Sequence, residues 1–459
     1  MTTKPRQAAR ARLLARLNES PPPFGRIEHR GTSAFGPSLS LERFRLANGL
    51  ELLLCEDKSA PVVAFHTWYR VGSRHEQRGK TGLAHLFEHL MFNETENLKS
   101  GEFDRRLEEA GAESNAGTWL DWTHYHVAVP KSQLPLVVRL ESERMGRLVV
   151  REPQVQSEKE VVANERRYRV DDDVESSVSE LLWATAFQTH PYHWPTIGWM
   201  ADIEAFATED CVSFYRTFYA PNNALLVVAG DVSERTLLPL VQRGYGGLEP
   251  SVIPPEELRP EPPQVDERRR EVHKPTSSQK VAIGYKSPGL GDFDYAPLTV
   301  LSEILFGGRA SRLHERLVRE LEIASEVRAF VSPFRDPGLF EIFAAAVGSH
   351  TAETLLSAID HELAMVREQP VSEAELARAC ARLELGGVSG LETADGKAST
   401  IGFYETVLGR PNAAFERLDA LHRVTASDVR RVARRYLIES SRSVVLVRPT
   451  VERGTEAAQ

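Results

Sequence analysis

The sequence predicts an α+β fold made of two tandem domains of similar plan. A chain of 459 residues is too long for one ordinary hydrophobic core, so two or more domains are expected. Residues 211–232 contain a helical pattern, an aromatic residue, a short turn and an apolar strand, and residues 428–449 repeat that order. Between them, residues 249–274 are rich in proline and arginine and are typical of a linker.

The predicted organisation therefore has five parts. They are an N-terminal extension (1–38), a first domain that contains the candidate catalytic residues (39–248), the linker (249–274), a second domain (275–450) and a C-terminal tail (451–459). Met1–Leu17 is basic and contains leucines but no continuous apolar run, so nothing in it indicates a secretory signal. Its composition also suits an organellar presequence, but a frayed helix or tail is the more common meaning of such a segment.

Composition excludes some classes of function. Hydrophobic residues make up 41% of the chain and charged residues 26%, as in ordinary globular proteins. The net charge of −9 argues against a nucleic-acid partner, because phosphate contacts need clustered lysine and arginine. Cys55, Cys211 and Cys380 lie far apart and are interpreted as reduced thiols. No run approaches 18 apolar residues, so no transmembrane segment is expected and a cytoplasmic location is predicted.

The first domain opens with strand patterns. Residues 44–57 contain a turn at Asn48 and Gly49 between two apolar runs, which predicts a hairpin, and residues 62–71 alternate as a strand does. A helix is expected over 101–111, and residues 112–130 again alternate as in a strand.

Residues 81–93, with the sequence TGLAHLFEHLMFN, form the most informative segment. In a helix, His85 and His89 lie about 40° apart on one face and roughly 6 Å apart along the axis, so both imidazoles can bind one zinc ion. Glu88 stands beside them in the order HxxEH, the inverse of the commoner HExxH. A carboxylate so placed can take a proton from zinc-bound water.

Two further helices are expected over 132–150 and 153–170. In the second helix, Glu158 and Glu165 are seven positions apart, which places them within about 20° on one face. Two aligned carboxylates often belong to nothing more than a solvated helix surface, and residue spacing alone does not decide between that interpretation and a functional one.

His124 and His126 are also candidate ligands. They alternate within a predicted strand and therefore share a face, but ordinary surface or packed histidines are the more common meaning of that pattern. In the second half, residues 279–287 predict a strand and residues 295–305 a helix that ends at Gly307 and Gly308.

The chain resembles the insulinase/pitrilysin family of inverse zinc metallopeptidases, in particular its short, two-domain branch related to bacterial and mitochondrial processing peptidases. The similarity extends over roughly residues 40 to 450, and the matching segments are VGSRHEQRGKTGLAHLFEHLMF, NAGTWLDWTHYHVAVP, SEKEVVANE, HPYHWPTIG and FYAPNNALLVVAGDV. The resemblance implies two domains that are each a largely antiparallel β-sheet packed on one face by α-helices.

The resemblance also assigns roles to individual residues. The family's third zinc ligand is a Glu about 76 residues after the second His, and 165 − 89 = 76, so Glu165 is expected to join His85 and His89. Glu158 matches a family Glu that supports the catalytic site.

Further resemblance concerns substrate binding. Asn115 and Ala116 match residues on an edge strand that binds substrate, and Arg319 matches a substrate-binding Arg. The Tyr that accompanies this Arg in active single-chain relatives is missing, and Ser325 or Glu326 takes its place. The second half contains no HxxEH motif.

The implied function is that of a zinc-dependent endopeptidase, which hydrolyses unfolded or extended peptides in an enclosed chamber with Glu88 as general base. A non-catalytic, structural family subunit and a zinc hydrolase of non-peptide substrates are the alternatives. Active relatives enclose substrate between four such domains, so a second chain is expected. The missing Tyr favours a related chain without HxxEH over an identical copy, and a homodimer is the alternative.

Overall fold

The computed structural model describes residues 3–257 and 259–450, and the predicted tail 451–459 lies outside the described residues. The chain forms two compact units that are interleaved in sequence. Among the described residues, the first unit contains 3–164, 195–257 and 387–416, and the second contains 165–194, 259–386 and 417–450. Each unit has its own β-sheet with associated helices, which confirms the predicted α+β fold of two domains.

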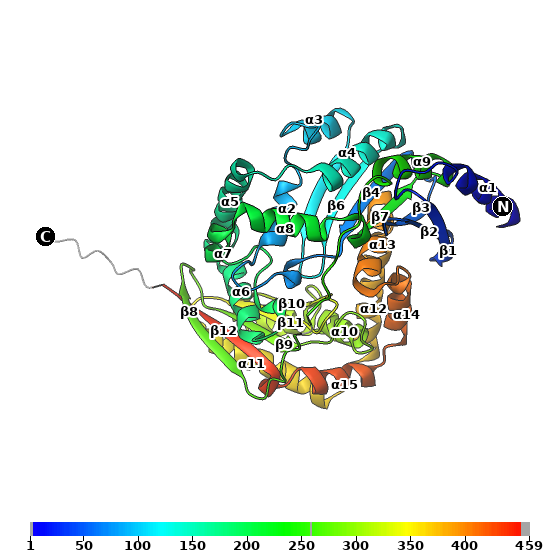
Figure 1. Ribbon diagram of the computed structural model, residues 1–459. Helices are drawn as coiled ribbons and strands as arrows, with labels where there is room; N and C mark the ends of the chain where they lie inside the picture. Colours follow the sequence, from blue (N-terminus) through cyan, green and yellow to red (C-terminus); the bar gives the residue numbers. More distant parts are fainter. Residues whose placement is uncertain (1–2, 258, 451–459) are drawn as a thin grey trace. The chain divides into compact units, whose positions relative to one another are not determined.

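The first sheet has seven strands in the order β1-β2-β3-β7-β4-β6-β5 (Figure 1). Neighbouring strands are antiparallel except for β3 and β7, which are parallel. The strands are β1 (Ile27–Phe35), β2 (Leu39–Leu46), β3 (Glu51–Glu56), β4 (Val62–Tyr69), β5 (Glu113–Thr118), β6 (Thr123–Pro130) and β7 (Ala224–Gly230).

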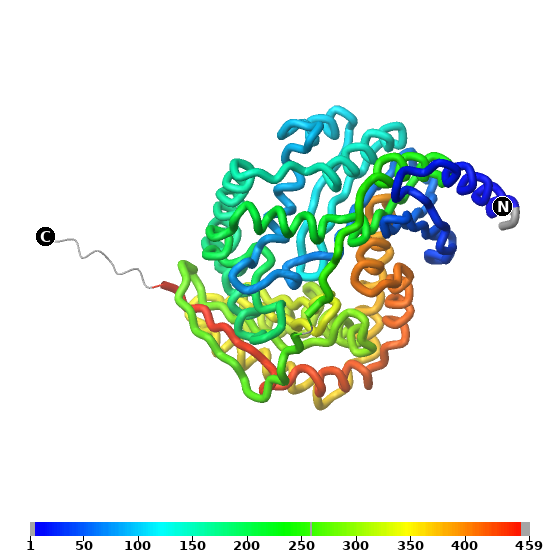
Figure 2. The backbone as a smooth tube through the Cα atoms, in the orientation of Figure 1, coloured from blue at the N-terminus to red at the C-terminus, as the bar shows by residue number. Residues whose placement is uncertain are grey.

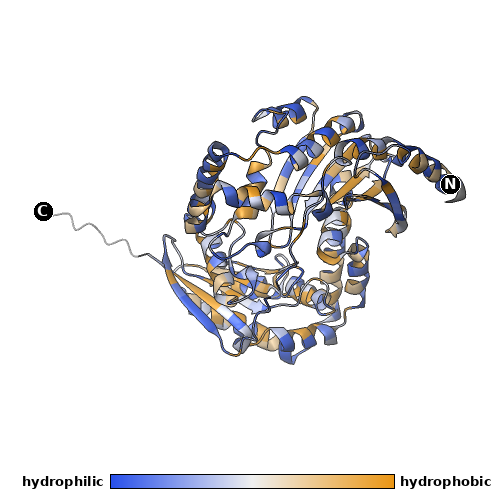
Figure 3. Ribbon diagram, in the orientation of Figure 1, coloured by the Kyte–Doolittle hydropathy of each residue, from blue (hydrophilic) through white to orange (hydrophobic). Residues whose placement is uncertain are grey.

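Helices cover the core face of this sheet. Strand β4 directs Phe65 and Thr67 toward that face, where the Thr67 hydroxyl donates a hydrogen bond to Glu141 of α4 at 3.0 Å. Most residues of α3 are hydrophilic, as the blue colour in Figure 3 shows. This helix buries only Phe103 and Leu107. The helices are α1 (Thr3–Leu17), α2 (Leu83–Leu90), α3 (Glu102–Glu109), α4 (Leu134–Arg147), α5 (Glu152–Arg166), α7 (Met200–Ala205), α8 (Thr208–Phe218) and α9 (Glu234–Tyr245).

The second sheet has five strands in the order β10-β11-β9-β12-β8. Its strands are β8 (Arg268–Lys274), β9 (Lys280–Lys286), β10 (Ala324–Val331), β11 (Leu339–Ala346) and β12 (Arg442–Pro449). The helices associated with this part of the chain are α6 (Val174–Ala186), α10 (Tyr295–Phe306), α11 (Ala352–Glu368), α12 (Glu373–Ser389), α14 (Ala413–Arg423) and α15 (Ala426–Tyr436). Two π-helical turns lie at Arg167–Asp171 and His314–Glu320.

The two sheets repeat one pairing pattern. In the first sheet β3 is parallel to β7, and β4, β6 and β5 follow as antiparallel neighbours. In the second sheet β8 is parallel to β12, and β9, β11 and β10 follow in the same way. The predicted similarity of plan is therefore confirmed, and α10 occupies the topological position of α2 without its HxxEH motif.

Each unit also contains one helix from the other half of the sequence. Helix α13 (Ala394–Leu408) packs on the first sheet, where Glu405 accepts two 2.7 Å hydrogen bonds from Arg43 of β2. In Figure 2 this orange segment lies beside the blue and cyan strands. Helix α6 packs on the second sheet, where the Ala186 carbonyl accepts a 2.7 Å hydrogen bond from Lys286 of β9.

One predicted strand is in fact a hairpin. Residues 112–130 form β5 and β6, which pair from Thr118↔Thr123 onward, with a tight turn over 119–122. Side chains alternate between the two faces on both sides of the turn, so the periodicity of the sequence did not reveal that the chain reverses its direction. The buried ion pair between Arg74 and Asp121, at 2.8 Å, fixes the turn.

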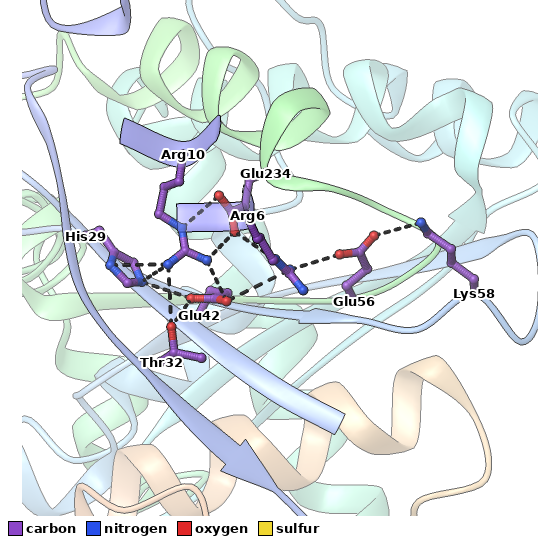
Figure 4. Close-up of polar contacts among 8 residues, drawn as sticks. All are labelled: Arg6, Arg10, His29, Thr32, Glu42, Glu56, Lys58 and Glu234. Carbon is purple, nitrogen blue, oxygen red and sulfur yellow. Dashed lines mark hydrogen bonds and ion pairs between the residues drawn. The ribbon is translucent and has the colours of Figure 1, made fainter. Parts of the chain in front are cut away.

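The N-terminal segment is part of the first unit and not a frayed tail. Arg10 of α1 is only 7% exposed and its guanidinium lies 2.5 Å from Glu234 of α9 and 2.6 Å from Glu42 of β2 (Figure 4). Strand β1 pairs along its length with β2, so the structure differs from the predicted extension 1–38. Strand β8 likewise lies inside the predicted linker 249–274.

Two smaller expectations concern cysteines and membranes. Cys55, Cys211 and Cys380 are all free thiols, as predicted. Between residues 3 and 450, leaving aside 258, the structure has no helix that is both long and apolar enough to cross a membrane.

Candidate metal centre

The HxxEH segment folds as the helix α2, as its periodicity predicts. Leu83, Leu86, Phe87 and Leu90 turn into the core of the first unit and are almost completely buried. The helix begins after Gly82, whose φ is +98°; an added Cβ there would also lie 2.5 Å from the Ile197 carbonyl oxygen, so glycine is required.

Glu76 holds the start of α2. Its carboxyl group accepts hydrogen bonds from the backbone N–H groups of Gly82 at 2.8 Å and Ala84 at 2.7 Å, which have no partner within the helix. Burial raises the pKa of this carboxyl group well above its usual range. Sequence reasoning missed Glu76, although a helix without a Ser, Thr, Asp or Asn cap could have suggested an acceptor from the preceding loop.

We expect Glu76→Ala to lower the free energy of unfolding by about 2 kcal/mol, because two buried N–H groups lose their acceptor. Glu76→Gln keeps one acceptor oxygen and should have a smaller effect. Denaturant unfolding of both variants, beside the exposed control Glu108→Ala, measures the difference. A Glu76→Ala variant as stable as Glu108→Ala would contradict this role.

The predicted zinc ligands come together. His85, His89 and Glu165 each place one potential ligand atom within 4.8 Å of the others. The rings of His85 and His89 are 5.0 Å apart between centroids, as expected for one helical face. Glu165 lies in the last turn of α5, and the boundary between the units falls inside this helix, after Asn164. Two imidazoles and one carboxylate form a donor set found in catalytic zinc sites, so these residues fit zinc.

Glu165 is partly covered, with 15% of its side chain exposed, and Arg169 lies 2.6 Å from its carboxylate. Arg169 belongs to the π-helical turn that follows α5. Wider π turns of this kind are frequent at functional sites.

Glu158 lies beside the metal ligands. Its Oε2 is 3.6 Å from Nδ1 of His89, and its Oε1 accepts a hydrogen bond from Asn93 at 2.9 Å. The contact with His89 lowers the pKa of the Glu158 carboxyl group. A carboxylate next to Nδ1 favours the tautomer in which Nε2 is free to bind metal, a common arrangement around zinc-binding histidines.

The candidate substrate residues lie in different units. Asn115 and Ala116 are on β5, the edge strand of the first sheet, and β5 lies next to α2. Arg319 is in the second unit, 65% exposed, and forms an ion pair with Glu315 at 2.7 Å. Ser325 is on β10, at the edge of the second sheet. The roles of Asn115, Ala116 and Arg319 in substrate binding stay predictions.

Comparison with known families decides the relationship. Residues 52–198 match the family model described as insulinase (peptidase family M16), and residues 205–383 match the model described as the peptidase M16 inactive domain. A zinc protease, PqqE, from Helicobacter pylori is 32% identical over 417 residues, which cover 89% of this chain and 93% of that protein. This chain belongs to the insulinase family.

Other relatives agree with this family. The mitochondrial-processing peptidase subunit beta of Lentinula edodes is 26% identical over 427 residues, which cover 89% of this chain and 91% of that protein. The crystal structure of a protease from Helicobacter pylori has a TM-score of 0.86 at 31% identity and covers 89% of this chain. The first half of the periplasmic protease PqqL from Escherichia coli, at 20% identity and a TM-score of 0.73, shows the fold alone.

The match to an inactive-domain model agrees with the second half of the sequence, where no HxxEH motif is present. The first half, in contrast, retains the complete motif at His85, Glu88 and His89. The complete HxxEH motif therefore lies in the first unit, on α2.

Proposed function

We propose that this insulinase-family chain is a zinc-dependent endopeptidase that hydrolyses unfolded or extended peptides. The observation that carries the proposal is the convergence of His85, His89 and Glu165 beside Glu88. Relatives named zinc proteases support the choice of metal.

In this proposal each residue has one task. His85, His89 and Glu165 hold zinc, whose Lewis acidity polarises the scissile carbonyl and makes the attacking water more acidic when the ion is bound. Glu88 accepts the proton of that water and then donates it to the leaving amine. The carboxylate of Glu158 orients the His89 ring by its contact with Nδ1 of that ring.

Strand β5 is the proposed binding surface for the peptide. An edge strand has backbone N–H and C=O groups that no neighbouring strand uses, so an extended peptide can add to it by main-chain hydrogen bonds. Asn115, which is exposed, and Ala116, which is half-buried, lie on this strand, and the proposed contact is made by backbone groups. Such binding selects peptides by their extended conformation more than by their side-chain sequence.

Hydrolysis of a quenched, unstructured peptide by the purified chain tests the proposal. We expect cleavage that a chelator removes and stoichiometric Zn²⁺ restores. Zinc bound without any peptide cleavage, also in the presence of a partner chain, would instead support a structural subunit or a hydrolase of other substrates.

We further propose that the active form contains a second, related chain that lacks HxxEH. The support is the absence of a Tyr near Ser325, where active single-chain relatives are expected to supply a donor to the transition state. One such donor is commonly worth about 3 kcal/mol of the reaction barrier, or about a hundredfold in rate.

The purified chain alone should therefore cleave peptides slowly and gain about a hundredfold when the partner is added. Peptidase assays with and without the partner, with light scattering to define the assembly, measure this gain. Full activity of a homodimer would reject the second chain and leave the roles of the zinc ligands unchanged.

The cytoplasm stays the proposed compartment. Three free thiols support a reducing environment. Cell fractionation with an antibody against the chain tests this location, and recovery from another compartment would reject it.

A further inference from the structure

Three histidines lie together on the first sheet, outside the HxxEH helix. His66 comes from β4, and His124 and His126 come from the neighbouring strand β6. The register places His66 directly opposite His126, and His124 two positions along the same face. Each of the three side chains can offer one ligand atom within 4.8 Å of the others.

Helix α13 covers this cluster and contributes a carboxylate. Asp395 Oδ1 lies 2.8 Å from Nε2 of His66 and 3.4 Å from Nδ1 of His126. The helix approaches the sheet closely at Gly402, where an added Cβ would lie 2.0 Å from Nε1 of Trp68. Helix α13 is therefore packed directly on β4, the strand that carries both Trp68 and His66.

We propose that His66, His124 and His126 form a second metal site for a borderline divalent ion such as Zn²⁺, with Asp395 as the residue that orients His66. The site is separate from the HxxEH motif and does not depend on the proposed peptidase activity.

The distances favour a metal over a simple hydrogen-bonded cluster. Nδ1 of His66 and Nε2 of His124 are 3.4 Å apart. That separation is long for a hydrogen bond, which is usually about 2.9–3.0 Å. It matches the edge of a tetrahedron with metal–nitrogen bonds of about 2.0–2.1 Å, which is roughly 3.4 Å.

Asp395 prepares His66 to bind metal. The Nε2–H of His66 donates to the carboxylate, which leaves the lone pair of Nδ1 directed toward His124. Carboxylates hold zinc-binding histidines in this way in many proteins.

The cluster is rigid on one side and accessible on the other. His66 is completely buried, and the ring of His124 stacks on Trp68 at 4.1 Å between centroids. His126 and Asp395 are 29% and 42% exposed, so an ion can enter from their side. Bound metal would connect β4 and β6 and, through Asp395, hold α13 on the sheet.

Metal content tests the proposal directly. After loading with Zn²⁺ and removal of excess, elemental analysis should give two equivalents for the wild type and one for His124→Gln/His126→Gln. His89→Gln should also retain one equivalent, and the exposed control His350→Gln should retain two. A double variant that binds as much zinc as the wild type would overturn the second site. Unchanged zinc in His89→Gln would contradict only the HxxEH site.

A more conservative substitution tests the site in a protein that still folds. Asp395→Asn should keep the far-ultraviolet circular dichroism of the wild type and weaken zinc binding at the second site about 10- to 100-fold. In the His89→Gln background, Zn²⁺ at 100 times its Kd should slow amide exchange of α13 about 100-fold. Exchange that zinc does not change, or an Asp395→Asn variant with unaltered affinity, would reject the proposed role of Asp395 and the connection to α13.

Discussion

Glu88→Gln is expected to bind a full equivalent of zinc at the HxxEH site and to lose peptide hydrolysis. Gln has nearly the same shape as Glu but cannot accept a proton, and general base catalysis is worth about 10²- to 10⁴-fold. Because Glu88 is not expected to bind the metal, the loss should appear in kcat and not in zinc content. Elemental analysis and steady-state kinetics on one preparation measure both quantities.

The matched control for this variant is Glu108→Gln, an exposed carboxylate of α3. It should keep both zinc and activity. A Glu88→Gln enzyme with stoichiometric zinc and undiminished turnover would remove Glu88 from the mechanism. A variant that loses its zinc would instead place Glu88 among the metal ligands.

Local periodicity explains why the HxxEH helix could be predicted. His85 and His89 belong to one short helix, so their relative position follows from helical geometry alone. Glu165 is different, because residue spacing left its role undecided and only the family resemblance assigned it. The structure brings its carboxylate within 4.8 Å of both imidazole donors.

Contacts between distant segments could not be predicted. Helices α6 and α13 each pack on the sheet of the other sequence half, and nothing in their periodicity identifies the sheet that will cover their apolar side. The same limit applies to the second histidine cluster. Sequence alternation placed His124 and His126 on one face of a strand. His66 joins them only because β4 pairs with β6, and Asp395 only because α13 packs on this sheet.

Glu165→Gln and Glu158→Gln should separate the residue that binds zinc from the residue that supports a ligand. A structural zinc site typically provides about 10–16 kcal/mol of binding free energy, so one of three protein ligands accounts for roughly 3–5 kcal/mol, or more than a hundredfold in affinity. Loss of a supporting residue typically costs about 10- to 100-fold. Glu165→Gln should therefore release zinc at chelator concentrations that Glu158→Gln withstands.

Competition with a chelator of known zinc affinity measures both variants, and Glu160→Gln, an exposed substitution on the same helix, provides the control. Because the second histidine cluster is proposed to retain its own zinc, the titration is done in the His124→Gln/His126→Gln background, where one site remains. Equal affinities for Glu165→Gln and Glu158→Gln would contradict the ligand assignment. If Glu158→Gln binds zinc more weakly than Glu165→Gln, Glu158 and not Glu165 is the ligand. Removal of the carboxylate that binds the metal must lower the zinc affinity more than removal of the carboxylate that contacts Nδ1 of His89.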